Sequence, residues 1–236
     1  MEKAHKTIEP IFEELEFCNE LMIIDARGVL FWPAEQMMIV SDLHLEKGSS
    51  FAARGRGFVP PYDSRVSLTL LSECARDWEP KRILSLGDSF HDADGAGRLD
   101  DRALLLLKEL MFSREWVWIS GNHDPSPPKD LGGMFASQLM LGQLNFVHEP
   151  RETFTIGEIA GHLHPCAKIR RRGKSVRRRC LVGDGYRLIL PAFGAFTGGL
   201  NIRDQAYDGL FSQSDLRAWL LGSDRVYCID GKELVR

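Results

Sequence analysis

Aspartate and histidine side chains follow apolar runs at several points along this chain of 236 residues. Asp42 and His44 follow the apolar run Met37–Val40, and His162 and His164 follow a later run with the same spacing. Residues two apart on extended backbone point to the same side. Each pair can therefore direct two ligand atoms toward one divalent metal ion. An isolated Asp-x-His is weak evidence, because a surface aspartate and a packed histidine are both common.

The histidines of the chain gather in such clusters. Six of the seven follow predicted strands, whereas only His5 lies elsewhere. The nitrogen and oxygen donors in the clusters are Asp42, His44, Asp88, Asn122, His148, His162 and His164. Seven donors are too many for one tetrahedral ion and suit two ions that share a carboxylate. With no thiolate among them, we predict two divalent ions, with Mn²⁺ preferred and Fe or Zn as alternatives.

The composition is that of an ordinary globular protein, with 44% hydrophobic and 27% charged residues. The net charge of −3 does not by itself demand nucleic acid or an anionic membrane as partner. Five scattered cysteines without a CxxC pair predict reduced thiols and a cytoplasmic protein. The polar N-terminus indicates no signal peptide, and no apolar run approaches the ~20 residues of a membrane span. We predict a single domain, residues 1–236, in which residues 1–20 form an arm or a short helix.

Strands and helices must bring these side chains together. The first half predicts a hairpin of Leu21–Ile24 and Val29–Trp32 and a loop over Glu46–Asp63. Asp63 is predicted to cap a helix that carries Val66, Leu70, Cys74 and Trp78 on one face. The further predicted elements are a helix near Asp101–Met111 and strands at Met37–Val40, Arg82–Leu86, Trp116–Ile119, Leu144–Val147 and Phe154–Ala160.

The last third of the chain begins with a basic stretch. Eight of the twelve residues Lys168–Arg179 are Lys or Arg, and Gly173 and Lys174 suggest the tip of a hairpin. Beyond it we predict a strand at Leu188–Leu190, a helical segment at 214–221 and a hairpin of Arg225–Ile229 with Glu233–Val235. The element order predicts an α/β (α+β) fold of mixed sheets flanked by helices. The site is expected at the carboxyl ends of the strands.

Five blocks of the sequence together resemble a known family. They are D-x-H at Asp42, GD-x-x-H at Asp88, GNHD at Asn122, the later His148, and GHLH at His162. In this order they are similar to the calcineurin-like metallophosphoesterases. A narrower likeness rests on SDLHLEKGSSFAARG, VPPYD, LGDSFHD, GHLHP and LPAFGAFTGGLN, which resemble the bacterial ligase-associated DNA-damage-response phosphoesterases.

The resemblance implies a sandwich of mixed sheets and a role for each motif residue. One ion would be bound by Asp42, His44, Asp88 and His164, and the second by Asp88, Asn122, His148 and His162. Asp88 would bridge the ions, and His123 would be the catalytic histidine near the leaving group. Many relatives orient that histidine with an aspartate where this chain has His91. His91 is therefore an alternative direct contact for the phosphate or the leaving group.

Several charged residues near these motifs have two interpretations. Arg54 is predicted to bind a substrate phosphate through its planar guanidinium, whereas Arg56 is assigned to solvent. Asp92, Asp94 and Asp124 are candidate hydrogen-bond acceptors for ligand histidines. Asp124 could equally cap the following turn. The basic stretch either contacts a phosphate backbone or forms a solvated hairpin whose charges pair with acidic residues.

The leading functional prediction is a dinuclear-metal phosphodiesterase that hydrolyses nucleic acid or a similar diester, in the setting of DNA repair. One alternative is a phosphomonoesterase or sugar-nucleotide pyrophosphatase with the same site. The other is a catalytically silent scaffold in a repair complex. The predicted partners are a phosphodiester substrate, repair proteins and a second copy in a homodimer, with no membrane.

Overall fold

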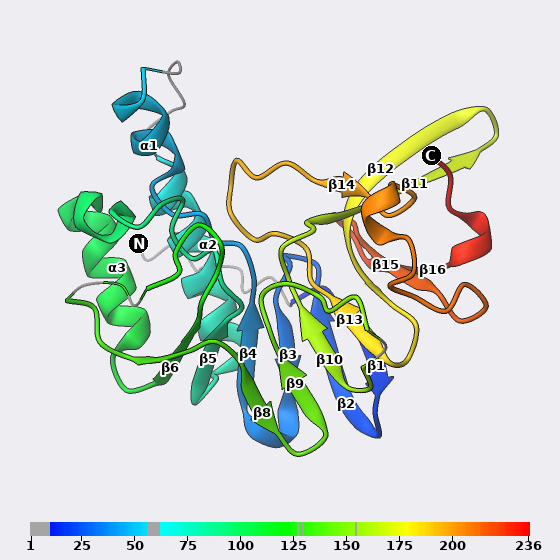
Figure 1. The fold of residues 1–236 in the computed structure, drawn as a ribbon, viewed down its shortest axis with the longest axis horizontal. Coiled ribbons are helices and arrows are strands. Elements are labelled where there is room, and N and C mark those ends of the chain that lie inside the picture. The colour runs from blue at the N-terminus through cyan, green and yellow to red at the C-terminus, as the bar shows by residue number, and fades with distance from the viewer. Residues whose placement is uncertain (1–9, 56–61, 127, 129, 154) are drawn as a thin grey trace, which may run out of the picture.

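The computed structural model describes residues 10–55, 62–126, 128, 130–153 and 155–236. Within these residues, two mixed β-sheets pack face to face, and helices cover the outer face of the first sheet (Figure 1). This arrangement confirms the predicted fold class. Predictions for residues 1–9 and 56–61 and for Phe154, which include the solvated Arg56, lie outside the described residues.

The first sheet has seven strands among the described residues, in the order β1-β2-β3-β4-β5-β6-β7. Its first four strands are antiparallel, and β4 to β7 run parallel. The strands are β1 (Phe12–Phe17), β2 (Glu20–Asp25), β3 (Leu30–Trp32), β4 (Met37–Val40), β5 (Arg82–Ser85), β6 (Glu115–Ile119) and β7 (Met134–Ala136).

The second sheet has nine strands in the described part of the chain, and its main path runs β14-β11-β12-β13-β10-β9-β8. Strand β10 runs parallel to both β9 and β13, and β15 and β16 extend the sheet from β12. The strands are β8 (Leu139–Leu141), β9 (Leu144–Phe146), β10 (Glu158–Ala160), β11 (Pro165–Arg171), β12 (Lys174–Gly183), β13 (Arg187–Ile189), β14 (Leu200–Asn201), β15 (Arg217–Leu221) and β16 (Val226–Asp230).

Successive side chains along a strand of the first sheet point to opposite faces and enter two different cores. In β4, Ile39 points into the core between the sheets, whereas Met38 and Val40 point toward the helices. The helices α1 (Lys47–Ala53), α2 (Asp63–Trp78) and α3 (Asp101–Met111) follow β4 and β5. Short 3₁₀ turns occupy Pro33–Glu35, Gly95–Arg98, Gln205–Tyr207 and Gly231–Glu233. A third core, beyond the second sheet, includes Ala167, Cys180 and Leu220.

Some local predictions in the first half are wrong. Residues 12–17 form β1 rather than a helix or arm, because they pair along their whole length with β2. The predicted loop after Glu46 contains α1. Asp63 does not cap α2, since its carboxylate accepts a hydrogen bond from the Gly48 amide nitrogen of α1. Steps of four residues drift about 40° around a helix, so Val66 is exposed. Cys74 is buried, on a face that also includes Leu68 and Leu71.

Two predictions near the C-terminus are also wrong. The predicted helix over 214–221 is strand β15, because Trp219 and Leu220 pair with Leu181 and Cys180 of β12. Tertiary pairing here overrides a local helical pattern. The predicted partner of β16 is also different: β16 pairs with β15, whereas Gly231–Glu233 forms a 3₁₀ turn.

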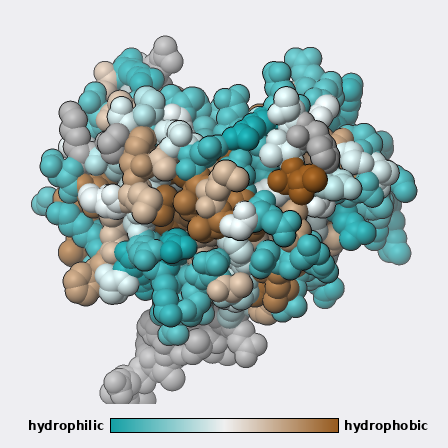
Figure 2. Space-filling model, turned by 60° about the horizontal axis from the view of Figure 1, so that its bottom comes forward, coloured by the Kyte–Doolittle hydropathy of each residue, from teal (hydrophilic) through white to brown (hydrophobic). Residues whose placement is uncertain are grey.

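Apolar side chains gather near the middle of one face of the molecule, with hydrophilic side chains around them (Figure 2). Large apolar side chains that are exposed in the described chain include those of Leu21, Met134, Met140 and Ile156. The homodimer stays a prediction. No helix among the described residues is long and apolar enough to cross a membrane.

Candidate metal centre

The predicted ligands lie in loops that follow parallel strands. Asp42 follows β4 by two residues, Asp88 and Asn122 follow β5 and β6 by three, and His148 and His162 follow β9 and β10 by two. The carboxyl ends of β4, β9 and β10 face the same edge of the two sheets (Figure 1). Both sheets therefore contribute ligands, which confirms the predicted position at strand carboxyl ends.

One group of side chains joins Asp42, His44 and His164. Their ligand atoms all lie within 4.8 Å of one another. His44 Nε2 lies 3.3 Å from His164 Nε2, which in turn lies 3.1 Å from Asp42 Oδ1. All three residues belong to the first predicted metal shell.

A second group joins Asp88, His148 and His162, again with ligand atoms within 4.8 Å. His148 Nε2 lies 3.5 Å from Asp88 Oδ1, 3.0 Å from Asn122 Oδ1 and 3.2 Å from His162 Nδ1. The other carboxylate oxygen of Asp88, Oδ2, lies 3.9 Å from His44 Nε2 of the first group. Asp88 therefore stands between the two groups, where a bridging ligand has to be.

The two groups fit divalent cations. Asp42 is fully buried, and its Oδ1 has no hydrogen-bond donor among the described residues. Its Oδ2 accepts hydrogen bonds from Ser41 Oγ and from the His162 amide nitrogen. The polar atom that faces this buried oxygen is His164 Nε2 at 3.1 Å, and a cation bound by both atoms would satisfy the carboxylate. His148 Nδ1 donates to the Leu86 carbonyl oxygen at 2.8 Å, so that Nε2 is the nitrogen that faces the centre.

Burial is the first influence on the protonation of these groups. It lowers the pKa of His44 to about 3, although Asp42 and Asp88 act against it. Burial alone would raise the pKa of Asp88, but the hydrogen bond and charge of His148 outweigh it and lower the pKa to about 2. For His148, burial is outweighed by Asp88 and Asp42, which raise its pKa to about 9. At neutral pH Asp88 is therefore ionised and His44 neutral, and His148 holds a proton that metal binding would displace.

The backbone at the ligands is left-handed rather than extended. Five of the seven predicted ligands have φ between 43° and 69°: Asp42, His44, Asp88, His162 and His164. Such angles are uncommon outside glycine and cluster at functional sites. The extended geometry predicted for the two i, i+2 pairs is therefore wrong. Asp42 and His44 do share a group, but His162 and His164 belong to different groups.

Asp124 ties the two central loops of the site together. Its carboxylate accepts hydrogen bonds from the amide nitrogens of Asp88, Ser89, Phe90 and Gly121, at 2.8 to 3.1 Å. Burial raises its pKa to about 6, and the charge of Asp88 adds to this. Neither predicted role of Asp124, as acceptor for a ligand histidine or as cap of the following turn, is what the structure shows.

The two other candidate acceptors also do something else. The Asp92 carboxylate accepts two hydrogen bonds from Arg98 Nη2 at 2.8 Å and lies 3.7 Å from Arg54 Nη2. No hydrogen bond to the side chain of Asp94 is found among the described residues; its backbone nitrogen donates to Asp92. Asp92 therefore holds arginines and not a ligand histidine.

Gly121 fits a space that admits no side chain. A Cβ at this position would collide with the backbone nitrogen and Oδ1 of Asp88 and lie 2.6 Å from Asp124 Oδ1. We expect Gly121→Ala to displace Asp88 and to lower metal affinity and activity by about 10- to 100-fold, as loss of outer-shell support does. Isothermal titration with Mn²⁺ and kinetic assays measure both. Gly97→Ala, where a Cβ meets no atom within 4 Å, should leave both within about twofold. Normal metal affinity in Gly121→Ala would show that the added methyl group does not displace Asp88.

His123 is oriented by a backbone group. Its Nδ1 donates to the His91 carbonyl oxygen at 2.9 Å, and its Nε2 lies 3.9 Å from Asp88 Oδ2. The side chain is 38% exposed and is thus open to a substrate. The His91 ring stacks on that of His123, and its Nδ1 lies 3.4 Å from His44 Nδ1. Burial and the neighbouring His123 lower the pKa of His91 to about 4, so that its ring is neutral at pH 7.

Lys47 makes a contact near the metal centre that sequence reasoning missed. Its Nζ donates to the Phe196 carbonyl oxygen at 3.1 Å and joins α1 to the segment 191–199. That segment is fixed to the loop 41–46, here called the metal loop, because the amides of Phe193 and Gly194 donate to the carbonyl oxygens of Ser41 and Asp42. The sequence signal for this contact was the family-like segment itself. Arg54, the predicted phosphate ligand, lies at the end of α1 with its side chain 53% exposed.

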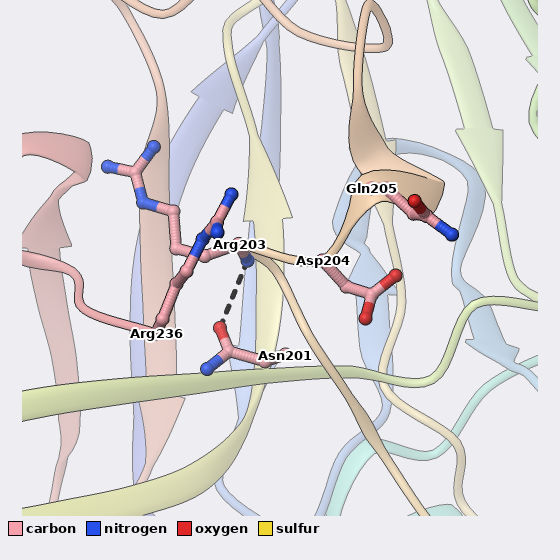
Figure 3. A pocket seen from close by; sticks show the side chains of 5 residues that line it. All are labelled: Asn201, Arg203, Asp204, Gln205 and Arg236. Carbon is pink, nitrogen blue, oxygen red and sulfur yellow. Dashed lines mark hydrogen bonds between the residues drawn. The ribbon is translucent and has the colours of Figure 1, made fainter.

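A separate polar pocket lies beside β14 (Figure 3). It is lined by Asn201, Arg203, Asp204, Gln205 and Arg236. The Asn201 side-chain oxygen accepts from the Arg203 amide nitrogen at 3.0 Å. None of these five is a predicted site residue, and Arg203 already donates to Gln213 and to the Gly231 carbonyl oxygen. The pocket is therefore not part of the metal centre.

The fold and the motifs agree with comparisons to known proteins. A family model described as calcineurin-like phosphoesterase matches residues 36–232. The crystal structure of Pseudomonas putida nuclease MPE matches with a TM-score of 0.71 and 25% identity, over 92% of this chain and 100% of that chain. Yfce, a phosphoesterase from E. coli, matches with a TM-score of only 0.42 and 14% identity, over 82% and 98% of the chains. A search of curated protein sequences finds no match.

Proposed function

This chain belongs to the calcineurin-like phosphoesterases and is a metal-dependent phosphoesterase, and from this premise we propose that it hydrolyses phosphodiester bonds with two divalent ions. The observation that carries the proposal is the place of Asp88 between the two His/Asp groups. We propose Asp42, His44, Asp88 and His164 as ligands of one ion and Asp88, Asn122, His148 and His162 as ligands of the other. Donors that are all nitrogen or oxygen favour Mn, Fe or Zn. Among these we propose Mn²⁺, with Fe and Zn as alternatives.

The bound ions would supply Lewis acidity and a water of lowered pKa. The side chains of the protein do the remaining work. Asp88 Oδ1 accepts from the His123 amide nitrogen at 2.9 Å, which fixes the loop that carries His123. Because Nδ1 of His123 is committed to a carbonyl oxygen, the protonated ring offers its second proton from Nε2. We propose that this proton goes to the leaving-group oxygen, which as an alkoxide would leave poorly without it.

The comparison with a solved nuclease supports a nuclease function for this chain. The P. putida structure is named as a nuclease and spans nearly the whole of this chain. We propose a polynucleotide as the substrate and DNA repair as the setting, with repair proteins as partners. We also propose one domain over residues 1–236. All five cysteines are described and unpaired, which supports the cytoplasmic location that the sequence predicts.

The proposal is tested with two synthetic esters. The purified chain, supplied with Mn²⁺, should hydrolyse bis-p-nitrophenyl phosphate with a higher kcat/KM than p-nitrophenyl phosphate. A preference for the monoester would overturn the diesterase proposal in favour of a phosphomonoesterase. Elemental analysis of the same preparation should find close to two ions per chain. A chain with neither bound metal nor activity with any divalent ion would be a scaffold.

Arg54 gives a separate prediction about substrate binding. We expect Arg54→Ala to raise the KM for a diester about tenfold and to change kcat little, because a guanidinium that binds ground state and transition state equally contributes to binding alone. Steady-state kinetics with bis-p-nitrophenyl phosphate and with a dinucleotide provide the measurement. Arg65→Ala is the matched control, because Arg65 lies on α2 and pairs with Asp100. An unchanged KM on both diesters would remove Arg54 from the binding site.

A further inference from the structure

The basic hairpin is the most highly charged feature outside the metal centre. Strands β11 and β12 pair antiparallel from Cys166 opposite Arg179 to Arg171 opposite Lys174. The hairpin projects from the body of the molecule (yellow in Figure 1). Residues 170–178 are all exposed. The eight cations of the stretch are Lys168, Arg170, Arg171, Arg172, Lys174, Arg177, Arg178 and Arg179.

The strand register divides these cations between two faces. Directly paired residues point to the same side of an antiparallel ribbon, and so do residues two apart on one strand. One face, here called the site face, carries Lys168, Arg170, Arg177 and Arg179. The opposite face, here called the outer face, carries Arg171, Lys174 and Arg178. Arg172 lies in the turn.

The site face is the one that adjoins the metal centre. Arg177 Nη2 donates to the Gly199 carbonyl oxygen, and Arg179 Nη1 donates to the Ala192 carbonyl oxygen at 2.8 Å. Both carbonyls belong to the segment 191–199, which is hydrogen-bonded to the metal loop at Asp42. The base of the outer face instead packs into the third core, through Ala167 and Cys180.

The cations of the site face are not neutralised by acids. Among the described residues, the one ion pair between this stretch and a carboxylate is Arg171 Nη2 to Glu233 Oε2, at 3.1 Å, on the outer face. Lys168, Arg170 and Arg177 have no such pair within the same residues. The alternative that acidic residues neutralise the hairpin therefore does not hold for the site face. Unpaired cations beside a phosphoester site point to an anionic substrate that extends beyond the bond to be cut.

We propose that the site face of the hairpin binds the phosphate backbone of a polynucleotide whose scissile bond lies at the metal centre. The inference rests on the proposed function and assigns the surface that binds its polynucleotide substrate. From Cys166 to Arg170 the strand covers about 13 Å at ~3.3 Å per residue. Over that length one strand of a duplex carries about four phosphates. No aromatic side chain lies among the cations, so the contact reads charge and is indifferent to base sequence.

Two triple variants with equal loss of charge test the proposal. The first is Lys168→Gln, Arg170→Gln, Arg177→Gln on the site face, and the second is Arg171→Gln, Lys174→Gln, Arg178→Gln on the outer face. Binding of labelled 20-nucleotide DNA and RNA strands is measured by fluorescence anisotropy with Mn²⁺, in a His123→Ala background so that the strands stay intact. Circular dichroism melting checks that both variants fold.

The site-face variant should bind at least about tenfold more weakly. The slope of log affinity against log salt should fall by about 2, because each lost phosphate contact of a single strand removes about 0.7. The outer-face variant should keep its affinity within about twofold of that of the unaltered hairpin. Its slope of log affinity against log salt should change by less than about 0.5. Equal losses in the two variants, or no loss in either, would overturn the proposal.

Activity on bis-p-nitrophenyl phosphate distinguishes a failure of the hairpin proposal from a failure of the proposed function. In chains that retain His123, the site-face variant should lose far more activity on the 20-nucleotide strand than on bis-p-nitrophenyl phosphate. Equal loss on both substrates would mean that the hairpin supports the metal centre and not the strand. Failure of the wild-type chain to cleave any diester would refute the proposed function, whereas the anisotropy comparison would still decide the role of the hairpin.

Discussion

Asp88→Asn is expected to lower kcat/KM on a phosphodiester by at least about 10³-fold. The substitution keeps the shape of the side chain and removes the charge that faces both groups of predicted ligands, with Oδ1 3.5 Å from His148 Nε2 and Oδ2 3.9 Å from His44 Nε2. Polarisation by a bound metal ion is worth several kcal/mol in such reactions, and each 1.36 kcal/mol is a factor of ten. Kinetics on bis-p-nitrophenyl phosphate measure the loss.

Metal content shows whether the loss in Asp88→Asn has the proposed cause. Elemental analysis should find fewer than two ions per chain in this variant. Asp92→Asn is the matched control, since this neighbouring carboxylate is held by Arg98 and is not a predicted ligand. It should retain two ions. Two ions and high activity in Asp88→Asn would contradict a bridging role.

His123→Ala is expected to have the second-largest effect, and its size should depend on the leaving group. With a dinucleotide, whose leaving group is an alkoxide, kcat should fall about 10²- to 10⁴-fold, the usual worth of general acid assistance. With a p-nitrophenyl ester the loss should stay below about tenfold, because p-nitrophenolate leaves without a proton. Steady-state kinetics on the two substrates give the ratio. An equal loss on both would assign His123 to binding or to structure.

His91→Ala provides the control for that experiment. Its backbone carbonyl, which orients His123, survives the substitution, and only the stacked ring and the contact with His44 are lost. We expect metal binding to persist and the leaving-group dependence to match that of the unaltered chain. A dependence like that of His123→Ala would show that the His91 ring takes part in proton transfer.

The order of strands and ligands was accessible from the sequence because each apolar run ends in a polar cluster. Parallel strands place their carboxyl ends at one edge of a sheet, so the convergence of Asp42 with Asp88 follows from the order of the first sheet. His148 follows a strand of the second sheet, and it reaches them because the two sheets pack face to face. For this reason the predicted fold class is confirmed, and the predicted ligands lie in the loops after strand carboxyl ends. The comparisons support the family that the motifs indicated.

The backbone conformation of the site could not be predicted from the spacing of the motif residues. The left-handed backbone at Asp42 and His164 is maintained by tertiary contacts, such as hydrogen bonds from the Gly194 amide to the Asp42 carbonyl oxygen and from the Leu200 amide to that of His164. The role of Asp124 depends on amides 34 to 36 residues away. The β15 error has the same origin, because pairing with β12 decides the conformation of a segment whose own pattern is helical.

The contact between His44 and His164 also bears on the order in which the protein folds. The two Nε2 atoms are 3.3 Å apart, yet 120 positions separate the residues in the chain. Closing a loop of that length costs roughly 4 kcal/mol of chain entropy, so a single ion has little chance of nucleating the centre in an unfolded chain. We therefore expect the two sheets to pack together before metal binds between them. Bound metal would thus act late in folding: it would stabilise the folded chain and would not nucleate its folding.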